Sequence, residues 1–231
     1  MPAPVPEVVV LDVNETLTDL RPLAARFEEV GAPGHLLATW FAAVLRDGIA
    51  LAAAGGYSRF PDLAAEVLRE LLAAETDAGR AEPACDPAEA AAHVLAGLAQ
   101  LPLHPDVAPG IAALRATGLR VVALTNGLAE PAAAVLSAGG LSGLLEACLS
   151  VDAVHRWKPA PEPYRYAAQT CGVAPEAMML AAVHPWDIDG AQRAGLSGAW
   201  INRRGARYPN TMLAPTLECE DFVALAECLS A

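Results

Sequence analysis

An aspartate at the end of an apolar run is the first residue of this chain that could do chemistry. Asp12 follows Val8-Val9-Val10-Leu11, and small and polar residues come directly after it. Such a run is typical of a buried parallel strand, and α/β folds hold their active sites at the carboxyl ends of such strands. A carboxylate placed there can act as a covalent nucleophile. The alternative is that Asp12 only caps the helix that follows.

Three further polar sequences stand where predicted strands end. Thr125-Asn126-Gly127 would offer a hydroxyl, an amide and the N–H groups of a helix N-terminus to an anion. Lys158 lies in a Lys-Pro turn, with Tyr164 about two helical turns behind it. Residues 183–190 supply an imidazole, an indole and a carboxylate. Each alone could be a helix cap or a solvated loop charge, but all four in this order indicate one polar site.

Strands and helices that alternate along the chain must position these residues. Beyond about residue 103 the pattern predicts strands over 119–125, 147–150, 178–183 and 198–202, and helices over 107–117, 129–138, 161–171 and 187–194. Such alternation implies a doubly wound parallel sheet with right-handed crossovers, a Rossmann-like α/β fold. The first strand must join this sheet, so we expect an α/β core of residues 1–18 and 103–231, with residues 19–102 inserted as a cap domain.

The inserted block is helical in pattern almost throughout. Apolar residues recur at helical spacing over 36–45 and again over 63–72. Asp62 is placed to cap the second of these helices, and Asp86-Pro87 predicts the start of another. We interpret the block as a helical cap domain over the active-site edge of the sheet.

Composition and charge narrow the class of protein. The chain has 231 residues and a formal net charge of −12, and an acidic surface argues against a nucleic-acid partner. No uninterrupted apolar run is long enough to cross a bilayer, so no membrane partner is expected. Residues 1–7 lack the features of a signal peptide, which predicts a cytoplasmic protein. The five cysteines lie far apart, which favours small, buried, reduced residues over disulfides or metal ligands.

The order and types of the polar residues resemble the haloacid dehalogenase (HAD) superfamily over nearly the whole chain. Within it, the chain is most similar to the type II (S)-2-haloacid dehalogenases. The likeness rests on the Leu-Thr-Asn-Gly turn at 124–127, Lys158-Pro159 with Tyr164, Trp186-Asp187 before Gly190-Ala191, and Trp200-Ile201-Asn202-Arg203. It implies a hydrolase that displaces halide from small (S)-2-haloacids through an aspartyl ester, with no metal ion or other cofactor.

The resemblance also implies a role for each catalytic residue. Asp12 would be the nucleophile that attacks the halogen-bearing carbon, and Thr16 would orient it. Lys158 would hold Asp12 ionised, since a nearby cation lowers the pKa of a carboxyl group, and would help bind the substrate carboxylate. Asp187 would position or activate the water that hydrolyses the ester.

Other residues would surround the substrate if the resemblance holds. Thr125 and Asn126 would donate to the substrate or the departing halide, and Tyr164 would complete the polar network near Lys158. The remaining predicted substrate-binding positions are Leu45, Phe60 and Trp186, which would line an apolar pocket, together with Val13, Asn14, Phe41 and His184.

The chain departs from the pattern of the phosphatases in this superfamily. They carry an acid two positions after the nucleophile, where this chain has Asn14, whose amide has no proton to give at neutral pH. They also carry an acidic magnesium ligand at the position of Val183, which cannot bind a metal ion. A phosphoryl-transfer site that lacks both groups should be poor, so a phosphatase is the alternative function.

The chain also departs from the dehalogenase pattern. Phe41 stands where those enzymes have an arginine that stabilises the halide, Asn14 replaces a tyrosine, and His184 replaces an asparagine. Losing one donor at a developing anion costs on the order of 10²–10³ in rate. Arg46, one turn further along the same helix, could compensate, and so could His184.

A diverged member that only binds a small acid is a further alternative. The joint presence of Asp12, Lys158 and Asp187 argues against it, because a binding protein needs no nucleophile beside a water-positioning carboxylate. The expected partner is therefore a small-molecule carboxylate substrate. Apolar cap positions such as Leu37 and Val44 could face a second subunit as readily as the core, so the sequence leaves a homodimer open.

Overall fold

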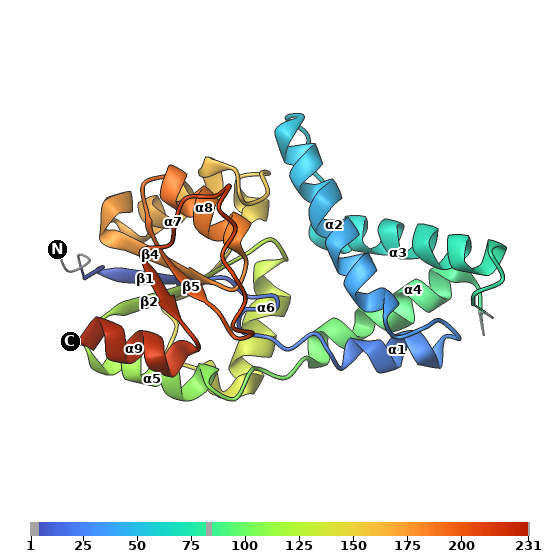
Figure 1. Cartoon of the computed structure of the whole chain (residues 1–231), viewed down its shortest axis with the longest axis horizontal. Helices are drawn as coiled ribbons and strands as arrows, with labels where there is room; N and C mark the ends of the chain where they lie inside the picture. The colour runs from blue at the N-terminus through green and yellow to red at the C-terminus, as the bar shows by residue number, and fades with distance from the viewer. Residues whose placement is uncertain (1–4, 82–84, 231) are drawn as a thin grey trace. The chain divides into compact units, whose positions relative to one another are not determined.

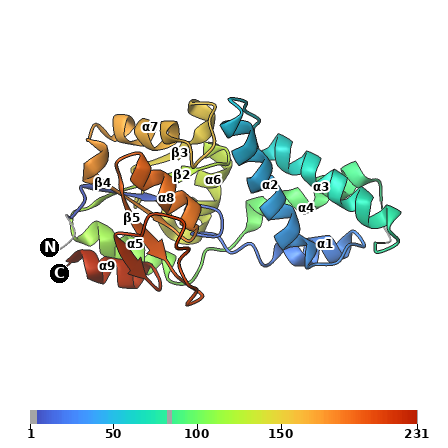
Figure 2. The ribbon, with the colours of Figure 1, turned by 45° about the horizontal axis from the view of Figure 1, so that its top comes forward.

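The computed structural model describes residues 5–81 and 85–230. Residues 1–4, on which part of the signal-peptide interpretation rests, lie outside the described residues. The chain divides into two compact units, Met1–Thr18 with Leu103–Ala231, and Asp19–Pro102. We call the first the α/β unit and the second the helical unit (Figures 1 and 2).

A six-stranded sheet forms the centre of the α/β unit, in the order β3-β2-β1-β4-β5-β6 (Figure 1). The strands are β1 (Val8–Leu11), β2 (Arg120–Thr125), β3 (Ala147–Ser150), β4 (Met178–Ala182), β5 (Ser197–Ile201) and β6 (Leu217–Cys219). Each pairing between these strands is parallel, and β1 lies between β2 and β4. The predicted Rossmann-like class is therefore confirmed, because the first strand does join the later ones.

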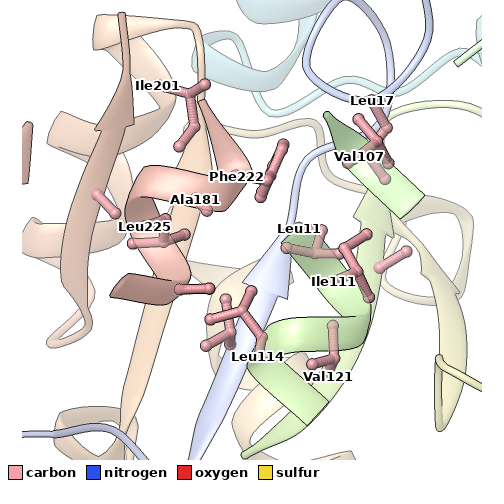
Figure 3. Close-up of a cluster of buried hydrophobic side chains, with 14 of the residues drawn as sticks. Leu11, Leu17, Val107, Ile111, Leu114, Val121, Ala181, Ile201, Phe222 and Leu225 are labelled. Carbon is pink, nitrogen blue, oxygen red and sulfur yellow. The ribbon is translucent and has the colours of Figure 1, made fainter. Parts of the chain in front are cut away.

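Helices cover both faces of this sheet (Figures 1 and 2). The helices of this unit are α5 (Val107–Ala116), α6 (Ala129–Leu136), α7 (Pro161–Cys171), α8 (Pro185–Arg193) and α9 (Phe222–Ser230). Successive side chains of a strand point to opposite faces, so both faces of β1 are buried. Val9 and Leu11 pack with α5 and α9, as Figure 3 shows for Leu11, while Val8 and Val10 pack with α7 and α8. A continuous apolar run thus holds Asp12 at the end of a central strand.

Two elements of the α/β unit were not predicted from the sequence, β6 and α9. The strand β6 is only three residues long and carries the exposed Glu218 at its centre, so it has no apolar run to recognise. The helix α9 follows it and buries Phe222 and Leu225 in the same cluster as α5.

The helical unit consists of α1 (Leu23–Glu29), α2 (Leu36–Ala53), α3 (Phe60–Asp77) and α4 (Pro87–Ala96). Asp86 caps α4 as expected, since its carboxylate accepts from the Ala88 N–H at 2.8 Å. The expectation that Asp62 caps α3 is wrong. The helix begins at Phe60, so Asp62 falls inside its first turn, where it pairs with Arg59 at 2.9 Å.

The helix α2 is long and apolar enough to cross a membrane by length and composition alone. It carries the ion pair Arg46–Asp47 at its centre. Its Trp40 is fully buried against Phe27 and donates from Nε1 to the Ala64 carbonyl of α3 at 3.0 Å. Its buried residues form one stripe that packs on neighbouring helices, which is the pattern of an amphipathic helix of a globular domain.

The five cysteines are free thiols, but the prediction that they are buried is largely wrong. Cys219 is buried, whereas Cys85, Cys148 and Cys171 are half-buried and Cys228 is exposed. Cys228 lies on the outer side of α9, which turns its other side to the sheet.

Gly110 of α5 is packed so closely against α9 that there is no room for a side chain. A Cβ atom there would lie 2.5 Å from both the carbonyl carbon and the Cβ of Phe222 in α9. We expect Gly110→Ala to lower the free energy of unfolding by about 1–3 kcal/mol, although alanine is the better helix former by about 1 kcal/mol. Urea denaturation followed by circular dichroism measures this, with Ala112→Ser on the exposed side of α5 as control. A Gly110→Ala protein as stable as the control would contradict the close packing.

Candidate active site

Polar side chains from the ends of β1, β2 and β4, and from the loop before α7, meet at the carboxyl edge of the sheet. Asp12, Thr16, Lys158 and Asp187 form one hydrogen-bonded cluster in which every member is buried. The sequence predicted these four as the catalytic set, and the α/β unit brings them together.

Both carboxylate oxygens of Asp12 are held. Oδ1 accepts from the Lys158 ammonium at 2.7 Å, and Oδ2 accepts from the Thr16 hydroxyl at 2.6 Å. Thr16 in turn accepts from the Val183 N–H at 3.1 Å, which links the loop after β1 to the end of β4. The side chain of Asp12 is therefore committed to this cluster and does not cap a helix.

Lys158 has no exposed surface, so it is not a solvated loop charge. Its ammonium donates to Asp12 Oδ1 and Asp187 Oδ2, each at 2.7 Å, and to the Leu124 carbonyl at 3.0 Å. These three acceptors use all three of its protons. Its main-chain N–H donates to Asn126 Oδ1 at 3.0 Å, so the amide after β2 fixes the loop that carries the lysine.

Asp187 lies in the first turn of α8, whose N-cap is His184, so Asp187 is not the cap either. Its Oδ2 accepts from Lys158, and its Oδ1 accepts from the Tyr164 hydroxyl at 2.5 Å. Tyr164 is fully buried, and its predicted place in the network near Lys158 agrees with these contacts.

The environments of the two aspartates push their pKa values apart. Burial raises the pKa of Asp12, but the charge of Lys158 and the contacts with His184 outweigh burial and hold it well below its ordinary value. Burial raises the pKa of Asp187 above its ordinary value, and neither Lys158 nor Tyr164 fully offsets that. Burial alone would lower the pKa of Lys158, but the two carboxylates raise it. Asp12 is thus suited to be the ionised nucleophile, and Asp187 to accept a proton.

His184 lies between Asp12 and an acid that the sequence did not single out. Its Nδ1 is 3.3 Å from Asp12 Oδ2, and its Nε2 is 2.8 Å from Glu15 Oε2. The indole of Trp186 stacks on its ring, with 5.1 Å between the ring centres. Burial would lower the pKa of His184, but hydrogen bonds to the two carboxylates raise it to about 9. The imidazole is therefore positively charged at neutral pH.

Glu15 has a left-handed backbone, with φ of 62°, which is costly for a residue other than glycine. Its main-chain carbonyl oxygen lies 3.1 Å from His104 Nε2, and its carboxylate lies 2.8 Å from His184 Nε2. Strained backbone of this kind clusters at functional sites. The sequence feature that could have identified Glu15 is its position, since it is an acidic residue three positions after Asp12 in the same loop.

The other predicted residues of the α/β unit lie near this cluster in different ways. The Thr125 hydroxyl accepts from the Gly127 N–H at 2.9 Å, as a local turn would require. Asn14 is half-exposed in the loop after β1. Val13 packs into the hydrophobic cluster around α5, so contact with a ligand would have to come from its main chain.

Phe41, Leu45 and Phe60 belong to the helical unit, where Phe41 and Leu45 lie on α2 and Phe60 begins α3. Their predicted contacts with substrate stay predictions. Within residues 5–81 and 85–230, no group of three or more histidine, cysteine, aspartate or glutamate side chains is arranged to hold a metal ion.

Comparison with known proteins gives a consistent result. A family described as haloacid dehalogenase-like hydrolases matches residues 6–195. The haloacetate dehalogenase H-2 of Moraxella sp. (strain B) is 34% identical over 104 residues, which span 45% of this chain and 46% of that relative. The (S)-2-haloacid dehalogenase of Pseudomonas sp. (strain YL) is 27% identical over 95% of this chain and 92% of its own length. The solved structure of an L-2-haloacid dehalogenase aligns with a TM-score of 0.88 and 28% identity, over 99% of this chain and all of the other.

Proposed function

Because this chain belongs to the haloacid dehalogenase-like hydrolases, we propose that it hydrolyses the carbon–halogen bond of small (S)-2-haloacids. The proposed route is covalent and uses no metal ion, with Asp12 as the nucleophile. The observation that carries the proposal is the pairing of an ionised Asp12 with a buried lysine that also contacts a second carboxylate, Asp187.

In the first step, a carboxylate oxygen of Asp12 attacks the carbon that bears the halogen. A carbon–oxygen bond forms, the carbon–halogen bond breaks, and the halide leaves with the bonding electron pair. The depressed pKa of Asp12 supports this step, because only the ionised form is a nucleophile. The hydroxyl of Thr16, 2.6 Å from Oδ2, restricts the carboxylate to one orientation.

In the second step, water adds to the carbonyl carbon of the Asp12 ester, and Asp187 accepts a proton from it. The raised pKa of Asp187 supports this assignment, because a carboxylate of ordinary pKa is a weaker base. Collapse of the adduct releases the 2-hydroxy acid and restores the Asp12 carboxyl group. The hydroxyl of Tyr164 holds Asp187 in place through its Oδ1.

The halide is the harder group to account for, because Phe41 offers it no hydrogen-bond donor. In the α/β unit, we assign the halide to Asn126 and Thr125, two buried residues at the end of β2. The amide of Asn126 is turned so that Oδ1 accepts from Lys158, which makes Nδ2 its donating group. These two residues support halide stabilisation without a contribution from the position of Phe41.

The test is halide release from (S)-2-chloropropionate and chloroacetate in the presence of EDTA. We expect stoichiometric halide and the corresponding hydroxy acid, with a rate that does not change when the chelator is added. A parallel assay of phosphate esters with Mg²⁺ tests the phosphatase alternative. Phosphate release that depends on Mg²⁺, without any halide, would overturn the proposal and would mean that Asn14 and Val183 do not disable phosphoryl transfer.

The same incubation also tests the alternative of a protein that only binds a small acid. In that case the protein would hold the haloacid while Asp12 stays unmodified after long incubation. Intact-protein mass spectrometry separates the two outcomes, since a covalent route transiently adds the carboxyalkyl group of the substrate to the protein as an ester of Asp12.

A further inference from the structure

The proposed route leaves one proton transfer without a donor. When the ester of Asp12 is hydrolysed, the oxygen that departs with the product becomes an alkoxide, a poor leaving group unless it receives a proton. Asn14 stands two positions after Asp12, and an amide cannot supply that proton at neutral pH. The acid must therefore come from elsewhere in the site.

We propose that His184, held by Glu15, is the general acid of ester hydrolysis and protonates Asp12 Oδ2 as that oxygen leaves with the product. This inference rests on the proposed function. Its basis is a chain of contacts, from Glu15 Oε2 to His184 Nε2 at 2.8 Å and from His184 Nδ1 to Asp12 Oδ2 at 3.3 Å. Glu15 acts through the histidine and is a positioning residue.

The geometry requires both nitrogens of His184 to carry a proton. Each nitrogen faces a carboxylate oxygen, and an ionised carboxylate only accepts hydrogen bonds, so the neutral ring could satisfy only one of them. The raised pKa of His184, about 9, agrees with this requirement. The stacked indole of Trp186 fixes the plane of the ring, so the Nδ1 proton stays directed at Asp12.

The separation of 3.3 Å is longer than a strong hydrogen bond, which suits an acid that acts only after the ester has formed. Contacts of this kind tighten in the reacting complex. The other oxygen, Oδ1, already accepts from the buried ammonium of Lys158. That cation is placed to stabilise the charge on the oxygen that stays with Asp12, which leaves Oδ2 as the departing oxygen.

The protons and electrons of this step balance. The water oxygen bonds to the carbonyl carbon, the bond from that carbon to Oδ2 breaks, and the Nδ1 proton of His184 moves to Oδ2. One water proton goes to Asp187 and then to solvent. The other stays on the new carboxyl group of Asp12 and returns to His184, because the pKa of Asp12 is far lower.

Two charged groups contact His184 directly, and three more are connected to it through Asp12 or Thr16. Asp12 and Glu15 contact it, Lys158 and Asp187 lie on the other side of Asp12, and Arg203 donates to the Thr16 carbonyl at 3.0 Å. The carboxylates that touch the ring raise its pKa, so the acid is present at neutral pH and is lost as the pH rises through about 9. Removing the charge of Glu15 should move that loss to lower pH by about 1–3 units.

The first experiment is a single turnover of (S)-2-chloropropionate by His184→Ala and by the parent protein. We expect ester hydrolysis to slow by on the order of 10²–10⁴ in the variant, while the first equivalent of halide is released at nearly the parent rate. The Asp12 ester should then accumulate and appear in the intact-protein mass. In a contrary result, the rate of halide release in the first turnover would fall as much as the overall turnover rate, and no ester would accumulate. That result would show that His184 acts on the halide, and would overturn the proposal.

Glu15→Gln provides a milder variant that keeps the shape of the side chain. We expect the alkaline limb of its turnover to move to lower pH, which a residue of purely structural importance would not cause. NMR titration of the histidine ring, assigned by the signal missing from His184→Ala, tests the same pair in the protein without substrate. The inference is overturned if His184 titrates with a pKa near the ordinary value of 6.5. It is also overturned if the pKa of His184 is the same in Glu15→Gln as in the parent protein. Absence of halide release by the parent protein would instead refute the proposed function.

Discussion

Replacing Asp12 with asparagine should abolish halide release, with a loss on the order of 10⁴-fold or more. The asparagine amide fits the same space, but it carries no negative charge and cannot form the ester. The single amide oxygen can accept from Lys158, and the amide NH2 group can donate to the Thr16 hydroxyl, so the substitution removes the chemistry with little change in shape. Halide chromatography under saturating (S)-2-chloropropionate measures the effect.

The matched control for this variant is Asp189→Asn in α8. Asp189 is also a carboxylate of the α/β unit, but it pairs with Arg193 at 2.8 Å and lies outside the cluster around Asp12. Its substitution should leave halide release unchanged. If Asp12→Asn kept activity within tenfold of the parent, another group would have to be the nucleophile, and the covalent route through Asp12 would be wrong.

The second large effect is expected for Lys158→Met. The substitution keeps the apolar part of the side chain but removes the cation that both Asp12 and Asp187 contact at 2.7 Å. Breaking a buried ion pair by removing one partner costs about 3–5 kcal/mol, because the remaining charge is uncompensated. Two carboxylates are left here, so we expect a loss of unfolding free energy in that range at pH 8.

The stability loss should depend on pH in a defined direction. Without the cation, burial and the charge of Asp12 raise the pKa of Asp187 further above that of the unfolded chain, while Asp12 keeps its contact with His184. The penalty is then present above the unfolded pKa of Asp187 and is relieved as the pH falls through the raised one. Lys158→Met should therefore be closer to the parent in stability at pH 4.5 than at pH 8, as urea denaturation can measure.

The double variant Lys158→Met with Asp187→Asn is the control for this argument. It leaves one buried carboxylate in place of two, and should recover part of the lost stability without recovering halide release. A single variant as stable as the parent at pH 8 would contradict the assignment of Lys158 as the group that compensates both carboxylates.

Much of the site could be predicted because the sheet places its residues by a simple rule. Asp12 and the residues after 124 and 182 each end a buried strand, and parallel strands present their carboxyl ends at one edge. The apolar runs that mark those strands are visible in the sequence. The fold class and the grouping of Asp12 with the residues after β2 and β4 therefore followed from local patterns, whereas Lys158, in the loop before α7, was placed there by the family resemblance.

The contact between Glu15 and His184 could not be predicted in this way. It joins residues 169 positions apart and depends on a left-handed backbone at Glu15. The sequence does not indicate that conformation, because the residue is not a glycine. The mistaken cap at Asp62 has a similar origin. Several residues near a helix start can serve as its boundary, and the choice depends on packing that the local sequence does not specify.

The wide separation of the paired residues also orders events during synthesis. His184 is 172 positions from Asp12, and at about 5–20 residues per second a ribosome adds it roughly 9–34 s after the aspartate. Residues 19–102 form a contiguous unit that is complete long before then, whereas β1 must wait for β2 and β4. For most of this interval the Asp12 carboxylate on the nascent chain lacks Lys158, and it lacks His184 until the end. The polar cluster around Asp12 can therefore be completed only after β4 and the residues that follow it have been synthesised and β4 has paired with β1.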